Sequence, residues 1–167
     1  EELTTPGGGF VSKGTDLDGF GVEVVFGIEE LKNYSAETIP TNEGRVINRR
    51  NQMKRFLKGS SPRILRFAHC GLNAIDPLES FNWYHEHLGL LASDKLFLGD
   101  PKDPATPLQG IFSRLDKGAE PADHHTIFFL SAPMLSEGKP VMNHVSFEMF
   151  NIDDVFSPIH IKFVFIH

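Results

Sequence analysis

Four of the eight histidines in this sequence stand where an imidazole could do chemistry. His124 and His125 are adjacent in DHHTIFF, at the start of an apolar run that is typical of a buried strand. His69 and His144 lie in two further strand-like segments, RFAHCGLNA and NHVSFEMF. Imidazole titrates near neutral pH and is a common metal ligand, so these residues could transfer protons or bind a metal. Taken singly, each is also compatible with a satisfied histidine of the core or its rim.

The two-residue period of a strand decides which of these side chains can meet. If the strands of His69 and His144 begin two related units, their imidazoles point at one another across a shared cavity. Two imidazoles and a carboxylate form the metal site of non-haem Fe(II) oxygenases, which leaves positions open for substrate and O₂. Whichever of His124 and His125 lies on the cavity face could then serve as an acid–base, whereas the other would face outwards, to solvent or a hydrogen bond.

The segments that would position these histidines follow one another as strand, helix and three strands. Residues 63–76 predict a strand, and Asp76 followed by Pro77 predicts the start of a helix over 77–88 that ends before Gly89. The helical period favours a buried face formed by Leu78, Phe81, Tyr84 or His85, and Leu88. Three strands are expected next, over 91–98, 108–116 and 125–132.

The same order of elements starts again near the end of the chain. Residues 143–150 predict a strand and Asn151–Asp154 the start of a helix, whereas residues 8–28 predict a β-hairpin around the turn TDLDG. The sequence therefore indicates an α+β fold of paired βαβββ modules, with one complete module and partial modules at both ends. We expect residues 1–30 to form the closing hairpin of a preceding module and residues 31–62 a linker with a short helix at 44–57. Residues 63–132 would form a complete module, and residues 143–167 the start of a truncated final module. The absent initial Met and the abrupt end in SPIHIKFVFIH suggest truncation at both ends.

Charge and hydropathy argue against several classes of function. The net charge of −6 gives no basic surface for nucleic acid, and the basic run at 45–58 lacks interleaved aromatic residues. The apolar runs are too short to span a membrane and no signal peptide opens the chain, so a cytoplasmic location is expected.

Other polar residues have simpler explanations. His85 and His87 do not share a helix face and do not form an HExxH motif, so surface polarity explains them. Asp94 and Asp123 could orient imidazoles, but aspartate is common in turns. The single cysteine, Cys70, excludes an internal disulfide framework and fits a reducing compartment.

In order and spacing, three segments resemble the catalytic half of type I extradiol ring-cleavage dioxygenases, in the vicinal oxygen chelate (glyoxalase/bleomycin resistance/dioxygenase) superfamily: RILRFAHCGLNAIDPLESFNWYHEHLGLLASD, GIFSRLDKGAEPADHHTIFF and NHVSFEMFNIDDVF. GGFVSKGTDLDGFGVEVVFG resembles the closing hairpin of that family's preceding, non-catalytic domain. The resemblance implies paired βαβββ modules and one Fe(II), occasionally Mn(II), bound by two His and one Glu. It also implies cleavage of a catechol ring beside its hydroxyls by O₂, as in aromatic compound catabolism.

Carried over by position, the resemblance implies His69 and His144 as metal ligands. It implies His125 as the residue that helps to deprotonate substrate and protonates intermediates, with His124 second. No substrate-binding residue is indicated.

The family's glutamate ligand lies on the last strand of its final module, beyond the part that this chain matches. Glu148 faces the right way but sits four residues along the strand of His144, and Glu23 lies in a module where the family binds no metal. The third ligand is thus not in its expected position, which predicts weak iron binding and is compatible with a chain that is inactive as it stands.

Three functions remain open at this stage. The first is an extradiol dioxygenase whose partners are a small aromatic diol and O₂. A homo-oligomer is compatible with this function. The second is a non-catalytic module of the same fold that binds a small aromatic or acts in interactions. The third is a glyoxalase-like metal-dependent isomerase, which is less favoured because such isomerases do not need the additional histidine of the DHH pair.

Overall fold

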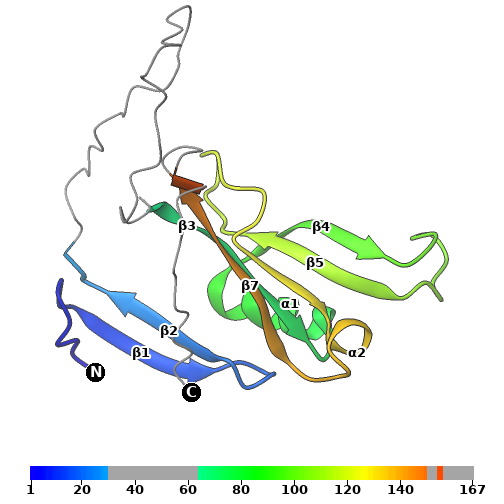
Figure 1. Cartoon of the computed structure of the whole chain (residues 1–167), viewed down its shortest axis with the longest axis horizontal. Helices are drawn as coiled ribbons and strands as arrows, with labels where there is room; N and C mark the ends of the chain where they lie inside the picture. Colours follow the sequence, from blue (N-terminus) through cyan, green and yellow to red (C-terminus); the bar gives the residue numbers. More distant parts are fainter. Residues whose placement is uncertain (30–63, 150–153, 156–167) are drawn as a thin grey trace, which may run out of the picture. The chain divides into compact units, whose positions relative to one another are not determined.

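The computed structural model describes residues 1–29, 64–149 and 154–155 (Figure 1). The chain divides into two units, one formed by 1–30 and 68–146 and the other by 31–67 and 147–167. The helix expected at 44–57 lies outside the described residues, as do 150–153 at the start of the helix expected near the end. The predicted domain boundaries stay a prediction. No helix among the described residues is long and apolar enough to cross a membrane.

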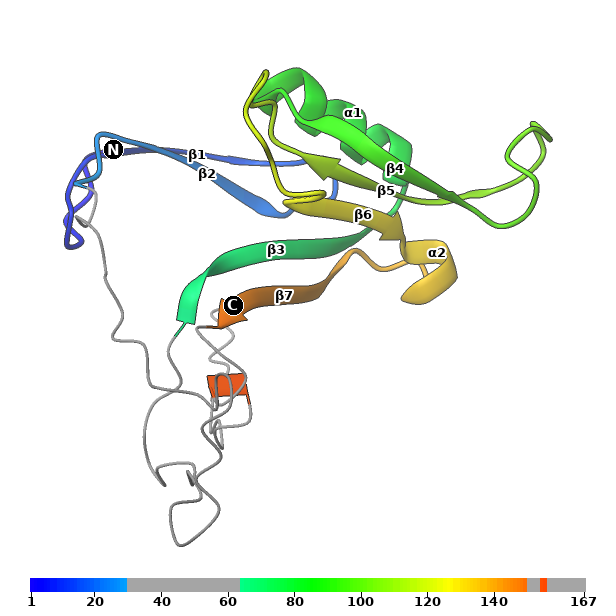
Figure 2. The same ribbon diagram turned by 90° about the horizontal axis from the view of Figure 1, so that it is seen from above.

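A five-stranded sheet carries the candidate site. Its strand order is β4-β5-β6-β3-β7, and its strands are Ile64–Ala74 (β3), Leu91–Phe97 (β4), Leu108–Arg114 (β5), Ile127–Ser131 (β6) and Val141–Met149 (β7). The pairs β4–β5 and β5–β6 are antiparallel, whereas β3 and β6 are parallel. The first strand of the complete module, β3, therefore neighbours β7, the strand that starts the next repeat (Figures 1 and 2). The predicted α+β class and the βαβββ order are confirmed.

The helix α1, Pro77–Leu88, has the predicted bounds because its two ends are locally encoded. The carboxylate of Asp76 accepts hydrogen bonds from the backbone N–H groups of Leu78 and Glu79, which caps the first turn. Gly89 adopts a left-handed conformation with φ 70°, which a residue with a Cβ atom rarely adopts, and ends the helix.

The buried face of α1 includes Phe81 and Tyr84, as predicted, but differs from the predicted face elsewhere. Leu78 and Leu88 are 41% and 39% exposed, and the buried residues are Pro77, Ser80, Phe81 and Tyr84. The buried stripe includes the hydroxyl groups of Ser80 and Tyr84 because aspartates of the N-terminal hairpin accept hydrogen bonds from them. An apolar pattern alone could not indicate that Ser80 would be buried.

That hairpin consists of β1, Phe10–Thr15, and β2, Gly21–Phe26, which pair in antiparallel register as predicted. Its turn contacts α1. Asp16 accepts a 2.9 Å hydrogen bond from the Tyr84 hydroxyl, and Asp18 accepts one of 2.7 Å from Ser80 Oγ. The turn sequence DLDG therefore joins the hairpin to the helix as well as reversing the chain.

The sheet has two faces with different contents. The core packs between the sheet and α1, which lies across β5 and β6 (Figure 2). It is formed by Leu72, Ala74, Phe81, Tyr84, Leu90, Ile111 and Phe129. Because side chains alternate along a strand, His69, Gly71 and Asn73 of β3 project to the face opposite Leu72 and Ala74. The histidines therefore occupy the face that α1 does not cover.

A short helix, α2 (Ala132–Leu135), follows β6 within a segment that was expected to be a loop. Pro133 suggests a loop in the sequence, but proline is compatible with the first turn of a helix, because the N–H groups there have no hydrogen-bond partner within the helix.

Stability at alkaline pH is expected to depend on Tyr84. Burial first, and then the hydrogen bond to Asp16, raise the pKa of Tyr84 well above its usual range. The unfolded chain would lose this proton above about pH 10 while the folded chain retains it, so the free energy of unfolding should fall as pH rises above that value. Urea unfolding of the protein and of Tyr84→Phe at pH 8 and above 10 measures this contribution. An equal loss of stability with pH in both proteins would contradict the prediction.

Candidate metal centre

Two neighbouring strands bring His69 and His144 together. Their Nε2 atoms lie 3.0 Å apart, and the ring centroids are separated by 5.2 Å at an interplanar angle of 71°. Two imidazole nitrogens that bind one metal at about 2.1 Å and at right angles are separated by about 3.0 Å. The pair therefore has a spacing that suits joint ligation of a divalent transition metal as well as an N–H···N hydrogen bond.

A chain of amide groups sets the tautomer of His144. Asn143 Nδ2 donates a 2.8 Å hydrogen bond to Asn73 Oδ1, which leaves Asn143 Oδ1 facing His144 Nδ1 at 2.9 Å. Since that oxygen can only accept, His144 donates from Nδ1 and keeps the lone pair on Nε2, toward His69. A metal-binding histidine commonly donates its second N–H in this way.

Sequence reasoning did not assign these two asparagines a role. Asn73 is 5% exposed, although its side chain is polar, and a polar residue buried on the face of His69 could have pointed to a partner. Its partner, 70 residues later in the chain, becomes evident only once β3 and β7 are neighbours.

His125 lies against the first of these imidazoles. The rings of His125 and His69 have centroids 4.4 Å apart at 51°. Burial lowers the pKa of both histidines, and the neighbouring imidazoles lower the pKa further. Both effects disfavour the charged form, so the neutral rings keep a lone pair at neutral pH.

Aromatic rings form the floor beneath the histidines. Phe128, which is 3% exposed, has its ring centroid 5.2 Å from that of His144 and 6.2 Å from that of His69. Phe112 packs against His125 with a centroid distance of 4.9 Å. The cluster thus combines polar ring atoms with an apolar, aromatic lining, which suits a small aromatic ligand.

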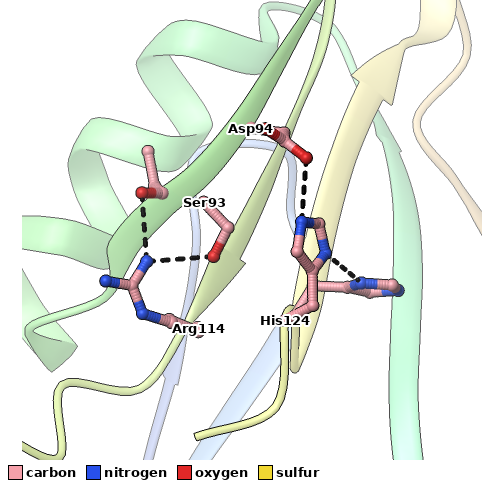
Figure 3. Close-up of polar contacts among 6 residues, drawn as sticks. Ser93, Asp94, Arg114 and His124 are labelled. Atoms are coloured by element: carbon pink, nitrogen blue, oxygen red, sulfur yellow. Dashed lines mark hydrogen bonds and ion pairs between the residues drawn. The ribbon is translucent and has the colours of Figure 1, made fainter.

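His124 lies between Asp94 of β4 and His125. Its Nε2 lies 2.8 Å from Asp94 Oδ2 and its Nδ1 lies 3.1 Å from His125 Nδ1 (Figure 3). It is therefore linked to His69 through His125, and its ring centroid also lies 6.2 Å from that of Phe112.

In the part of the chain that the structure describes, no group of three or more His, Cys, Asp or Glu side chains could hold a metal. Glu148 instead pairs with Arg66, with Oε2 2.6 Å from the guanidinium Nε. Glu23 lies on β2 opposite Lys13. The structure thus brings His69 and His144 together, with neither glutamate beside them, and their role as ligands stays a prediction.

Alanine at either candidate ligand is expected to weaken Mn(II) binding. Loss of a residue that merely orients a ligand costs about 10- to 100-fold in metal affinity, so loss of a ligand should cost at least as much. Calorimetric titration of Mn(II) into His69→Ala and His144→Ala measures this effect. His87→Ala is the matched control, because this exposed histidine stacks on Trp83 of α1. An affinity equal to that of the control would refute the ligand assignment.

Comparisons with known proteins support the fold and the superfamily. The chain matches a solved structure, the Mn(II)-bound glyoxalase from Novosphingobium aromaticivorans, with a TM-score of 0.54 and 23% sequence identity. The match covers 92% of this chain and 37% of that chain, so this chain spans little more than a third of its length. No curated protein matches the sequence. Residues 66–157, more than half of the chain, match the family model "Glyoxalase/Bleomycin resistance protein/Dioxygenase superfamily". On this evidence the chain belongs to the glyoxalase/bleomycin resistance protein/dioxygenase superfamily, as its sequence suggested.

Proposed function

We propose that this chain contributes to a metal-dependent ring-cleavage dioxygenase of the extradiol type, acting on a small catechol-type aromatic with O₂. The observation that carries the proposal is the position of the His125 ring, 4.4 Å from that of His69 in the His69–His144 pair. An additional imidazole beside a candidate two-histidine metal site suits a reaction that removes and returns a substrate proton.

The metal would be held by His69 and His144, whose facing Nε2 atoms suit a divalent ion. Both Fe(II) and Mn(II) are candidates, and the Mn(II) in the similar glyoxalase structure supports a divalent metal. When bound, the metal would lower the pKa of a catechol hydroxyl and allow substrate and O₂ to bind side by side.

The protein groups around the metal site have separate tasks. His125 accepts a proton from the second substrate hydroxyl and later returns one, since burial and neighbouring imidazoles keep it neutral. The rings of Phe112 and Phe128 would pack against an aromatic substrate and exclude water from it. The amides of Asn143 and Asn73 hold the His144 ring in the required orientation.

Oxygen uptake with catechol, with and without added Fe(II) or Mn(II), tests the proposal. We expect metal-dependent O₂ consumption together with a ring-cleavage product that absorbs in the visible range. The same samples are assayed for metal-dependent isomerisation of the hemithioacetal of methylglyoxal and glutathione. Isomerisation without ring cleavage would replace the dioxygenase by a glyoxalase-like enzyme. Neither reaction from folded, metal-loaded protein would leave a non-catalytic module.

A further inference from the structure

We propose that Asp94 is a positioning residue that fixes which ring nitrogen of His125 carries the proton, and that it acts through His124. The inference rests on the proposed function, because it concerns the residue given the acid–base role there. Asp94 lies on β4 and its carboxylate is 2.8 Å from His124 Nε2, while His124 Nδ1 is 3.1 Å from His125 Nδ1 (Figure 3). The three side chains therefore form a continuous hydrogen-bonded chain that ends at the metal site.

The direction of each hydrogen bond in this chain follows from the carboxylate of Asp94 at one end. An ionised carboxylate can only accept, so His124 donates from Nε2 to Asp94. A neutral imidazole carries one N–H, so His124 Nδ1 is left with a lone pair and accepts from His125 Nδ1. The single proton of neutral His125 is then on Nδ1, and its Nε2 carries the lone pair. Nε2 is therefore the atom that can take a proton from substrate.

A local irregularity of β4 aims Asp94 at His124. Ala92 pairs with Ser113 and Asp94 pairs with Phe112, so β4 holds one extra residue, Ser93, as in a β-bulge. Residues that oppose one another across two strands share a face of the sheet. The extra residue therefore places Asp94 on the face of Phe112, whose ring packs beside both His124 and His125.

Arg114 holds this irregularity in place. Its Nη1 donates to the backbone oxygen of Ala92 at 3.2 Å and to Ser93 Oγ at 3.0 Å (Figure 3). These bonds engage the two residues that precede Asp94. β-Bulges are frequent beside active sites, where they redirect a side chain, and the bulge of β4 has this effect on Asp94.

The expected effect concerns the tautomer of His125 rather than the stability of the protein. The side chains of His124 and Asp94 are 57% and 63% exposed, and a pair this exposed contributes little to folding. If the Asp94–His124 pair favours the Nδ1–H form of His125 by about 1 kcal/mol, its loss changes the ratio of the two tautomers about fivefold. Such a change is measurable by nuclear magnetic resonance.

The test uses the full chain, metal-free and labelled with ¹⁵N-histidine, at about pH 8, where an ordinary histidine is neutral. Long-range ¹H–¹⁵N correlation distinguishes an imidazole protonated on Nδ1 from one protonated on Nε2, and His124→Gln and His125→Gln assign the signals. We expect His125 as the Nδ1–H form and His124 as the Nε2–H form. Asp94→Ala should shift the His125 ratio about fivefold toward the Nε2–H form, and Asp94→Glu, which keeps a carboxylate, should restore it. Lys95→Ala, the next residue of β4, is the control.

A predominant Nε2–H form of His125 in the unmodified protein would overturn the inference, as would an Asp94→Ala spectrum identical to that of the control. The exposed position of Asp94 makes loss of folding unexpected, and circular dichroism checks each variant. Catechol cleavage by the metal-loaded protein is measured separately. Absence of cleavage with the expected tautomers would reject the proposed function and leave the positioning role intact. Cleavage together with the opposite tautomers would support the proposed function and reject the positioning role of Asp94.

Discussion

Replacing His125 with glutamine is expected to lower kcat/KM for cleavage of a catechol by about 100-fold or more in the metal-loaded protein. Positioned proton transfer contributes about 10²- to 10⁴-fold to such reactions, and glutamine keeps hydrogen-bonding groups but cannot take up and release a proton. The His125 ring is 4.4 Å from that of His69, close enough to serve a substrate that binds at the His69–His144 pair.

Two measurements make this prediction specific. The Mn(II) affinity of His125→Gln should equal that of the unmodified protein, since His125 is not assigned as a ligand. His87→Gln, an exposed histidine of α1, should retain full activity. Activity that survives His125→Gln would exclude an acid–base role, and a large loss of Mn(II) affinity would identify His125 as a ligand instead.

The parts of the fold that sequence predicted are those encoded by neighbouring residues. Asp76, Pro77 and Gly89 set the ends of α1 through hydrogen bonds and backbone conformations within a few residues. Strand positions followed from apolar alternation, with ends that differ by up to two residues, as at Ile127, where β6 begins. Ser80 was missed on the buried face of α1 because it is buried through contact with a turn that is more than 60 residues away.

In the candidate site, too, the features set by neighbouring residues were predicted and those set by residues far apart in the sequence were not. The four histidines were visible because they stand within or beside strand-like segments, and the strand period indicated which of them could meet. The pairing of Asn73 with Asn143 depends on which strands become neighbours, which no local pattern encodes. The irregularity that aims Asp94 at His124 depends on the register of β4 against β5, and a single extra residue reverses which side chains share a face.

Gly71→Ala is expected to destabilise the protein by about 3 kcal/mol, near the upper end of the usual cost of overpacking. A Cβ atom at Gly71 would overlap the ring of Phe128, well inside van der Waals contact. That ring is 3% exposed and lies between Phe112 and His144, with centroid distances of 5.0 Å and 5.2 Å. It therefore cannot turn aside without moving the residues on either side.

The same substitution should weaken metal binding at the candidate site, because Phe128 packs against the ring of His144. Urea unfolding gives the loss of stability, and calorimetric titration gives the loss of Mn(II) affinity. Gly14→Ala is the matched control, since no atom lies within 4 Å of the position of its Cβ and its backbone is in an ordinary region. Equal stability of the two variants would contradict the prediction.

A second substitution tests the cause. If the overlap with Phe128 is responsible, the double variant Gly71→Ala/Phe128→Leu should be less destabilised than the sum of its two single variants. A coupling free energy of about 1 kcal/mol or more is expected for residues in direct contact. Additive effects would place the cost in the backbone of β3 instead, and the histidines would then depend on the strand itself rather than on the aromatic floor beneath them.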